Sequence, residues 1–322
     1  MAKDLGRGHL VTEQRSAASM DIDTKSIREC LDIIHSQDQI CVDAVTPVLD
    51  RVAQATEFVV EAFRNGGRLI YAGAGTSGRL GVLDASECPP TFGVERTLVQ
   101  GIIAGGYEAL RRAIEGAEDF PEVGAKDVEE VIVPPGLRPE DVVMGIATGT
   151  TTPYVHGVLA QAKSKGCKTI FFCCTQEEDI RPEQRANIDV VINPIVGPEV
   201  VTGSTRMKAG TATKLVLNMI TTTAMIQMGK TYGNIMVDMR AWNEKLVDRA
   251  VRIIRTIATE ENLDISREAA AALLDKTDWR VKPALIMLLA ECSLEEATRH
   301  LKSCGGFVRR AIEEIRAERS KA

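Results

Sequence analysis

Five short apolar segments alternate with helical patterns through the middle of the chain, and this alternation restricts the possible folds most. Each segment is bounded by turn residues, which is typical of buried strands. Near-continuous apolar strands separated by helices indicate a parallel sheet covered on both faces. The sequence therefore predicts an α/β sandwich of three layers, with strands at 69–72, 98–104, 141–147, 169–174 and 190–194 and helices at 107–118, 123–131 and 153–165.

The chain on either side of this region has helical patterns only. A helix is expected to start near Thr24, and a second pattern at 37–64 should break at Pro47. The α/β region should end with a long helix at 209–228. After it, one helix at 239–261 and several shorter ones predict a small C-terminal helical domain. We expect a helical segment at 1–55, an α/β domain at 56–235 and the helical domain at 236–322.

Composition excludes several classes of function. A net charge of −6 and an aromatic content of 4% disfavour nucleic acid as a partner. We find neither a signal-peptide pattern nor an apolar run of about 18 residues, so no membrane contact is expected. Eight scattered cysteines without a C-x-x-C pair indicate reduced thiols and a cytoplasmic location. The four histidines are not spaced as ligands, so no metal site is predicted.

The turn after the first strand is rich in glycine and hydroxyl groups. Residues 73–79 read GAGTSGR, and the glycines allow several backbone N–H groups to approach one anion. Arg79 follows Gly78 where a P-loop needs Lys, and no acid for a ribose follows the second strand. A short helix is expected at 80–83. We predict that this turn holds a phosphate monoester through Gly75, Thr76, Ser77 and Arg79.

Two further segments carry polar candidates for the same edge of the sheet. The third strand is followed by Thr148, Thr150 and Thr151, which either bind sugar hydroxyls or form an ordinary loop before a helix starting at Pro153. The segment 197–214 leads into the long helix, whose start favours anions. Its candidate ligands are Glu199, Ser204, Thr205 and Lys208. Lys214 is a further candidate for contact with a phosphate or carboxylate, and Arg206 would lie near the helix start.

Four long motifs together resemble one bacterial enzyme family. They are ASECPPTFG, AIEGAED, GPEVVTGSTRMKAGTATKLVLNMI and YGNIMVD, and the likeness runs from TEQR at Thr12 to GGF at Gly305. The chain resembles the N-acetylmuramic acid 6-phosphate etherases, sugar-isomerase-domain (SIS) enzymes related to the animal glucokinase regulatory protein. This resemblance implies a homodimer with a SIS-type sandwich. It also implies cleavage of a lactyl ether to N-acetylglucosamine 6-phosphate and D-lactate, in peptidoglycan recycling.

The resemblance also places two catalytic carboxylates. The acid–base residue of the family's SEC motif falls on Glu87, and the carboxylate of its EGAED motif falls on Glu118 rather than Glu115. We expect Pro89 and Pro90 to stiffen a loop that holds Glu87. The helix predicted at 107–118 would place Glu118 at a negative helix end, where a carboxylate is a stronger base. Glu115 is spaced to pair with an arginine of that helix.

The expected reaction needs no cofactor. In the open-chain aldehyde, removal of the C2 proton lets the C3 oxygen leave, and water then adds to the double bond. Glu118 would remove the proton, while Glu87 would protonate lactate and then activate water.

One departure from the family pattern leaves other functions open. The family usually has Ser-Gly-Arg-Thr-Pro after the third strand, whereas this chain has TGTTTP at 148–153 and lacks the arginine, as the regulatory-protein branch does. After the next strand, CTQE at 174–177 replaces an Asn-Pro turn. A phosphosugar isomerase of the same fold and a non-catalytic phosphosugar-binding regulator therefore stay as alternatives.

Overall fold

The protein forms two compact units. A computed structural model describes residues 8–239 and 244–321. The first unit contains the chain up to Glu87 together with Arg96–Thr222, and the second contains Cys88–Glu95 and the chain from Thr223 onward. The predicted division into segments 1–55, 56–235 and 236–322 stays a prediction.

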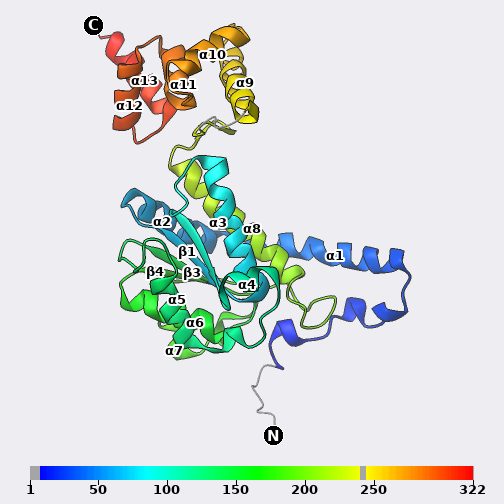
Figure 1. The fold of residues 1–322 in the computed structure, drawn as a ribbon. Helices are drawn as coiled ribbons and strands as arrows, with labels where there is room; N and C mark the ends of the chain where they lie inside the picture. Colours follow the sequence, from blue (N-terminus) through cyan, green and yellow to red (C-terminus); the bar gives the residue numbers. More distant parts are fainter. Residues whose placement is uncertain (1–7, 240–243, 322) are drawn as a thin grey trace. The chain divides into compact units, whose positions relative to one another are not determined.

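A parallel five-stranded sheet forms the centre of the first unit, as the alternating pattern predicts (Figure 1). Strand β1 pairs with β2 on one side and β3 on the other, so that Gly73 lies opposite both Ile103 and Ile146. The carboxyl ends of these strands therefore meet at one edge. The strand order is β2-β1-β3-β4-β5, with β1 at Leu69–Gly73, β2 at Val99–Ile103, β3 at Val142–Ile146, β4 at Lys168–Phe172 and β5 at Val190–Ile192.

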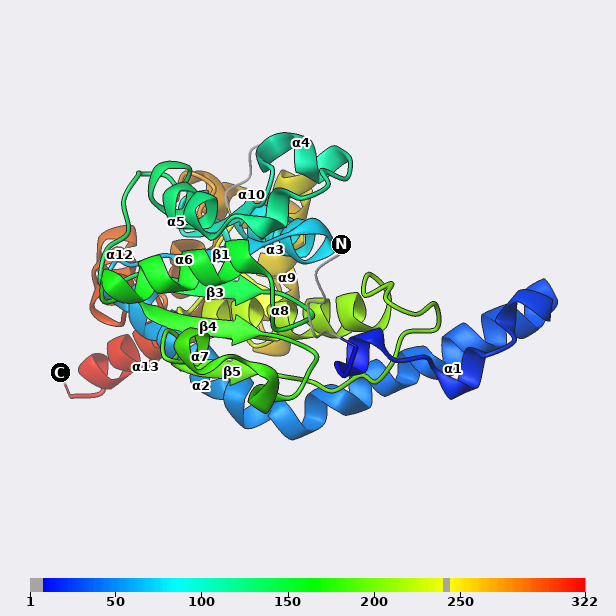
Figure 2. The ribbon, with the colours of Figure 1, turned by 90° about the horizontal axis from the view of Figure 1, so that it is seen from below.

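Helices cover both faces of this sheet (Figures 1 and 2). Neighbouring residues of a strand face opposite sides. A methyl group added at Gly145 would lie against Val155 of α6 (Pro153–Ser164). A methyl group added at Gly81 of α3 (Gly75–Phe92) would lie against Ile146, so Gly145 and Ile146 face different helices. The sheet therefore separates α3 from α6 and α5 (Pro121–Glu130), which packs on α6. Further helices of this unit are α2 (Leu49–Arg64), α7 (Pro182–Arg185) and α8 (Lys208–Gln227).

The first long helix has an apolar stripe that its own chain covers only in part. Helix α1 (Ile27–Val45) starts with a capping box between Ser26 and Glu29. The break predicted at Pro47 is confirmed, because a 3₁₀ turn at Thr46–Val48 separates α1 from α2. Cys41 and Val45 are buried, but Ile27 is 82% and Leu31 57% exposed on the same stripe. Figures 1 and 2 agree that α1 extends away from the sheet.

Two helix predictions near the candidate site are wrong. The helix expected at 107–118 is only α4 (Gly106–Arg111), and Glu118 lies in a separate 3₁₀ turn, η5 (Ala117–Asp119). Gly116 starts that turn with a φ of +75°, a conformation that a helix interior does not contain. The short helix expected at 80–83 is instead the 18-residue α3, which includes Pro89 and Pro90. These prolines therefore do not form a loop beside Glu87.

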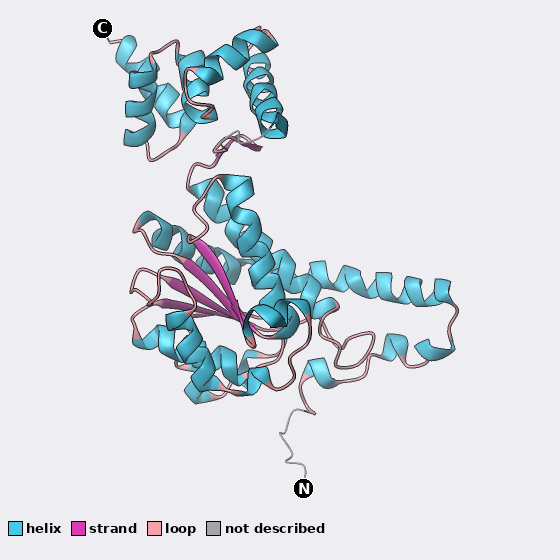
Figure 3. Ribbon diagram, viewed as in Figure 1, coloured by secondary structure: helices cyan, strands magenta, loops and turns pink. Residues whose placement is uncertain are grey.

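The second unit is helical apart from one short two-stranded ribbon (Figure 3). Its core is built mainly from apolar residues of the helices between 244 and 319, with Ile254, Leu285 and Ile315 fully buried. Of the helix predicted at 239–261, residues 240–243 lie outside the described residues. The elements are β6 (Thr231–Tyr232), β7 (Ile235–Met236), α9 (Glu244–Glu260), α10 (Arg267–Asp275), α11 (Val281–Ala290), α12 (Leu294–Ser303) and α13 (Val308–Arg319).

The helices of the described residues include none whose length and apolar character suit a membrane span.

Candidate functional site

The turn between β1 and α3 has the geometry of an anion cradle. A methyl group at Gly73 would lie 2.6 Å from the backbone nitrogen of Gly78, so only glycine allows this close turn. Gly75 has a φ of +52°, and the space beside its Cα is open. Because the first N–H groups of a helix have no partner within it, those of Gly75, Thr76 and Ser77 are placed to bind an anion. That this anion is a phosphate stays a prediction.

The threonine-rich turn after β3 lies beside this cradle because β1 and β3 pair in register. Thr148 O accepts a hydrogen bond from Cys174 N at 2.9 Å. Thr152 precedes α6 but makes no side-chain capping bond to it. The Thr150 hydroxyl is buried and has no hydrogen-bond partner. A polar ligand would supply one.

His156 of α6 fixes the backbone of that turn. Its Nε2 lies 2.6 Å from Thr150 O, and the ring is almost fully buried. Burial lowers the pKa of His156, although the bond to Thr150 acts in the opposite direction. The neutral ring, with its hydrogen on Nε2, therefore donates to the Thr150 carbonyl.

Arg79 lies on α3, and its side chain contacts backbone carbonyl groups at the end of α4. Its Nε lies 3.3 Å from Leu110 O and its Nη2 lies 3.1 Å from Arg112 O. The guanidinium thus ties the segment that contains α4 to the first turns of α3. Contact between Arg79 and a phosphate stays a prediction.

Glu118 lies in the loop region beside α6 and is exposed. The turn η5 packs on α6, and a methyl group at Gly157 of α6 would overlap Pro121 O, just after η5. This contact holds η5 close to α6. The expected negative helix end at Glu118 is wrong, since α4 ends at Arg111. Among the described residues Glu115 also lacks the predicted ion pair with an arginine of this helix, since α4 ends at Arg111 and Arg112 pairs with Glu108 at 3.4 Å.

Glu87 is exposed on the later part of α3. Twelve residues separate it from Gly75, which is about 18 Å along a helix axis. The segment that leads to Glu118 is tied near the start of α3 through Arg79. Within one chain, Glu87 therefore lies on the later part of α3, whereas the segment that leads to Glu118 is fixed near the start of this helix.

Two other predicted ligands already have structural partners. The buried Glu199 carboxylate accepts from Lys208 N at 2.9 Å and Ala209 N at 3.0 Å, so it caps α8. The Lys208 ammonium contacts Gln37 Oε1 and Pro198 O, both at 3.1 Å, and burial lowers the pKa of Lys208. Ser204 and Thr205 are half-buried in the loop before α8. Direct contact of these four residues with a substrate stays a prediction.

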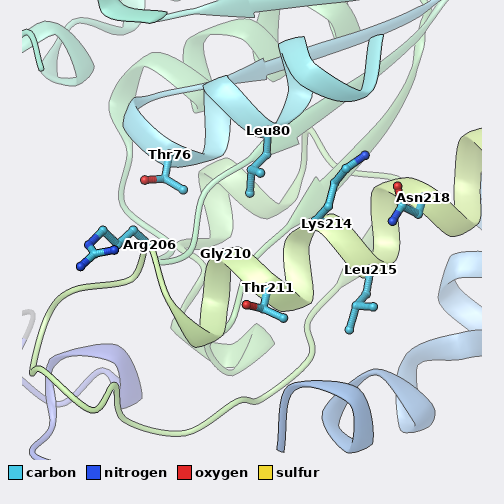
Figure 4. Close-up of a pocket in the computed structure, with 8 residues that line it drawn as sticks. All are labelled: Thr76, Leu80, Arg206, Gly210, Thr211, Lys214, Leu215 and Asn218. Carbon is cyan, nitrogen blue, oxygen red and sulfur yellow. The ribbon is translucent and has the colours of Figure 1, made fainter. Parts of the chain in front are cut away.

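A pocket of about 380 Å³ lies between α3 and α8 (Figure 4). A methyl group at Gly210 would lie 3.6 Å from Thr76 Cγ2, so the two helices meet beside the anion cradle. The sequence predicts a binding role for Thr76 and places Arg206 and Lys214 near an anion site, but it does not point to the other lining residues. The lining residues recur every four positions on both helices, as Thr76 and Leu80 do on α3, and this spacing was the signal for a shared face. The lining residues are Thr76, Leu80, Arg206, Gly210, Thr211, Lys214, Leu215 and Asn218.

The parallel sheet, with helices on both faces and a glycine turn after β1, is that of a SIS-type α/β protein. A model of the glucokinase regulatory protein N-terminal SIS domain matches residues 51–163. The chain is 50% identical over 305 residues to an N-acetylmuramic acid 6-phosphate etherase of Salinibacter ruber, with 94% of each chain covered. It is 48% identical to that of Yersinia pestis, with 95% of this chain and 99% of the relative covered. The chain belongs to the N-acetylmuramic acid 6-phosphate etherase family.

A solved structure is also similar. The phosphoheptose isomerase GmhA of Neisseria gonorrhoeae aligns with a TM-score of 0.45 and 18% identity, over 62% of this chain and 98% of that chain.

Proposed function

We propose that this chain cleaves the D-lactyl ether of N-acetylmuramic acid 6-phosphate, giving N-acetylglucosamine 6-phosphate and D-lactate in amino-sugar recycling. The observation that carries this proposal is the 50% identity to an etherase over 94% of both chains. Such coverage includes both carboxylate motifs, both sheet-edge turns and the second unit. A shared SIS domain alone would support only the phosphosugar class.

The reaction is an elimination followed by an addition. The open-chain aldehyde acidifies the C2 proton, and its removal lets electrons form the C2–C3 double bond as the C3–oxygen bond breaks. The departing oxygen takes a proton and leaves as lactate. Water then adds at C3 and a proton returns to C2. This sequence requires one base at C2 and one acid at the C3 oxygen.

The two exposed glutamates fit these roles. Glu118, on the loop beside α6, is proposed as the base at C2, and Glu87 as the acid at the C3 oxygen and the base for water. The phosphate would bind at Gly75, Thr76 and Ser77. The sugar would face Thr148, Thr150 and Thr151, where the unpaired Thr150 hydroxyl offers a hydrogen bond.

A homodimer would solve the separation of the two carboxylates. A six-carbon sugar held by its phosphate at the start of α3 is too short to reach Glu87, about 18 Å further along the helix. We therefore propose that the partner subunit's Glu87 completes each site. The exposed Ile27 and Leu31 of α1 support an assembly of copies, because large apolar groups favour burial. A cytoplasmic location, without nucleic acid or membrane partners, belongs to the same proposal.

An isotope experiment tests the function. The purified protein is incubated with N-acetylmuramic acid 6-phosphate in heavy-oxygen water, and D-lactate is assayed. Lactate should appear, and the label should enter the C3 hydroxyl of the sugar. Label in lactate would contradict elimination and addition. The absence of lactate would favour the phosphosugar-binding regulator, which the family model at 51–163 and the missing arginine at 148–153 keep as the second candidate.

A further inference from the structure

The pocket between α3 and α8 contains one cation that the protein does not neutralise. Arg206 is exposed at the pocket wall, in the loop that leads into α8 (Figure 4). Within the described part of the chain, its guanidinium takes part in no hydrogen bond or ion pair. Thr76 of the anion cradle lines the same pocket. Arg206 can therefore reach a ligand that is bound at the cradle.

The other charges around this pocket balance each other. Lys214 Nζ lies 2.7 Å from Asp84 Oδ1, and Asp84 Oδ2 accepts from the Tyr71 hydroxyl at 3.1 Å. The Glu199 carboxylate, near the start of α8, is bound by two backbone N–H groups and faces the positive helix end. One positive charge, that of Arg206, remains for a ligand.

The lining is apolar on one part and polar on another. Leu80 and Leu215 provide the apolar part, while Thr76, Thr211 and Asn218 provide hydroxyl and amide groups. A phosphate has oxygens on every side and no apolar surface to place against leucine. A lactyl group combines a methyl group with one carboxylate of charge −1. It therefore matches both the mixed lining and the single free cation better than phosphate does.

We infer that this pocket binds the lactyl arm of the substrate, with Arg206 holding its carboxylate and Leu80 and Leu215 contacting its methyl group. The inference rests on the proposed etherase function and adds the residue that selects the ether over other sugar phosphates. In this arrangement the phosphate occupies the start of α3 and the carboxylate occupies the pocket beside it. The two anions of the substrate are thus bound separately.

The test compares two substrates with wild type and Arg206→Gln. One substrate is N-acetylmuramic acid 6-phosphate, and the other is its lactyl carboxamide, which has the same shape without the charge. On the natural substrate, Arg206→Gln should lower kcat/KM about 10- to 100-fold, as expected for a charge-assisted hydrogen bond. On the carboxamide, the two proteins should differ by less than about threefold. Arg206→Lys should recover part of the loss on the natural substrate.

Two controls separate binding from folding. The inhibition constant of N-acetylglucosamine 6-phosphate, which has no lactyl arm, should be unchanged in Arg206→Gln. Arg252→Gln, an exposed arginine of α9 paired with Asp248, should behave as wild type. An equal loss on both substrates, or none on the natural one, would overturn the role of Arg206 while leaving the etherase function intact. Wild type that releases no lactate from either substrate would overturn the function and this inference together.

Discussion

At the scale of single residues, the candidate site combines fixed backbone with exposed carboxylates. His156 holds Thr150 O at 2.6 Å, and Arg79 holds the carbonyl groups of Leu110 and Arg112. The first bond positions the turn that carries the threonines. The other two position the segment that leads toward Glu118. Glu118 and Glu87 themselves are exposed. Neither forms an ion pair with another residue that the structure describes, so both carboxylates can approach a substrate without breaking one.

Glu118→Gln tests the assignment of the base. The amide has the same shape but cannot accept the C2 proton, so exchange of that proton with deuterium from solvent should stop. Proton NMR of the sugar in deuterated water measures the exchange. Glu115→Gln is the matched control and should exchange at the wild-type rate. Exchange at the wild-type rate in Glu118→Gln would show that another group is the base.

Asp141→Asn tests the buried pair at the other edge of the sheet. Arg68 contacts Asp141 at 2.6 Å, and both side chains are almost fully buried. Burial acts to raise the pKa of Asp141, but hydrogen bonds and the charges of Arg68 and Arg138 outweigh it and lower the pKa. The variant should lose about 3 kcal/mol of unfolding free energy at pH 7, because it leaves a buried charge unpaired.

The pH dependence of that loss follows from the lowered pKa. A carboxylate whose pKa is lower in the folded state stabilises the fold above its ordinary value of 3.8, and the effect disappears as the pH falls through the folded value. Urea denaturation of wild type and Asp141→Asn should therefore give converging stabilities under acid. Asp32→Asn, which removes an exposed pair with Arg28, should change stability little. A constant gap from pH 7 to acid would contradict this account.

At the scale of elements, close contacts between helices hold the loop that carries Glu118. Helices α5 and α6 approach so closely that a methyl group at Gly124 would overlap Tyr154 O, and one at Gly157 would overlap Pro121 O. The turn η5 precedes α5 directly. Any displacement of α5 from α6 should therefore also displace Glu118.

Gly157→Ala should affect stability and activity together. Overpacking a close contact costs about 1–3 kcal/mol, so the melting temperature should fall. The rate of C2 proton exchange should fall as well, because η5 moves with α5. Gly149→Ala, whose new methyl group would meet nothing within 4 Å, serves as the stability control and should melt like wild type. If Gly157→Ala melts lower but exchanges normally, the packing does not position Glu118.

The elements differ in how far the sequence could predict them. Strand β3 is a continuous apolar run, and the strand prediction at 141–147 matches Val142–Ile146 closely. The helical pattern at 107–118 failed because Gly116 adopts a positive φ, which local apolar spacing does not reveal. Pro89 and Pro90 suggested a loop, yet they lie within α3. For the site, the sequence places both sheet-edge turns and the position of Arg206 near the start of α8. The pocket itself is not predictable in this way, because it depends on a contact between α3 and α8, which are distant in sequence.

At the scale of the whole molecule, the proposed dimer makes a strict prediction. If each site uses Glu118 of one subunit and the partner subunit's Glu87, Glu87→Gln and Glu118→Gln should each be inactive alone. Mixed by unfolding and refolding together, they should recover about a quarter of wild-type activity, because half of the dimers then have one complete site. Lactate release measures the recovery, and refolded wild type is the reference. No recovery would mean that both glutamates act within one chain.

The carboxylate of Glu199 at the start of α8 has a consequence for ligand choice. Helices α3 and α8 begin beside each other, and two adjacent positive helix ends would suit a molecule with two phosphate groups. The Glu199 carboxylate already occupies the positive end of α8. A sugar bisphosphate would meet that negative charge, so the protein should discriminate in favour of sugars phosphorylated once.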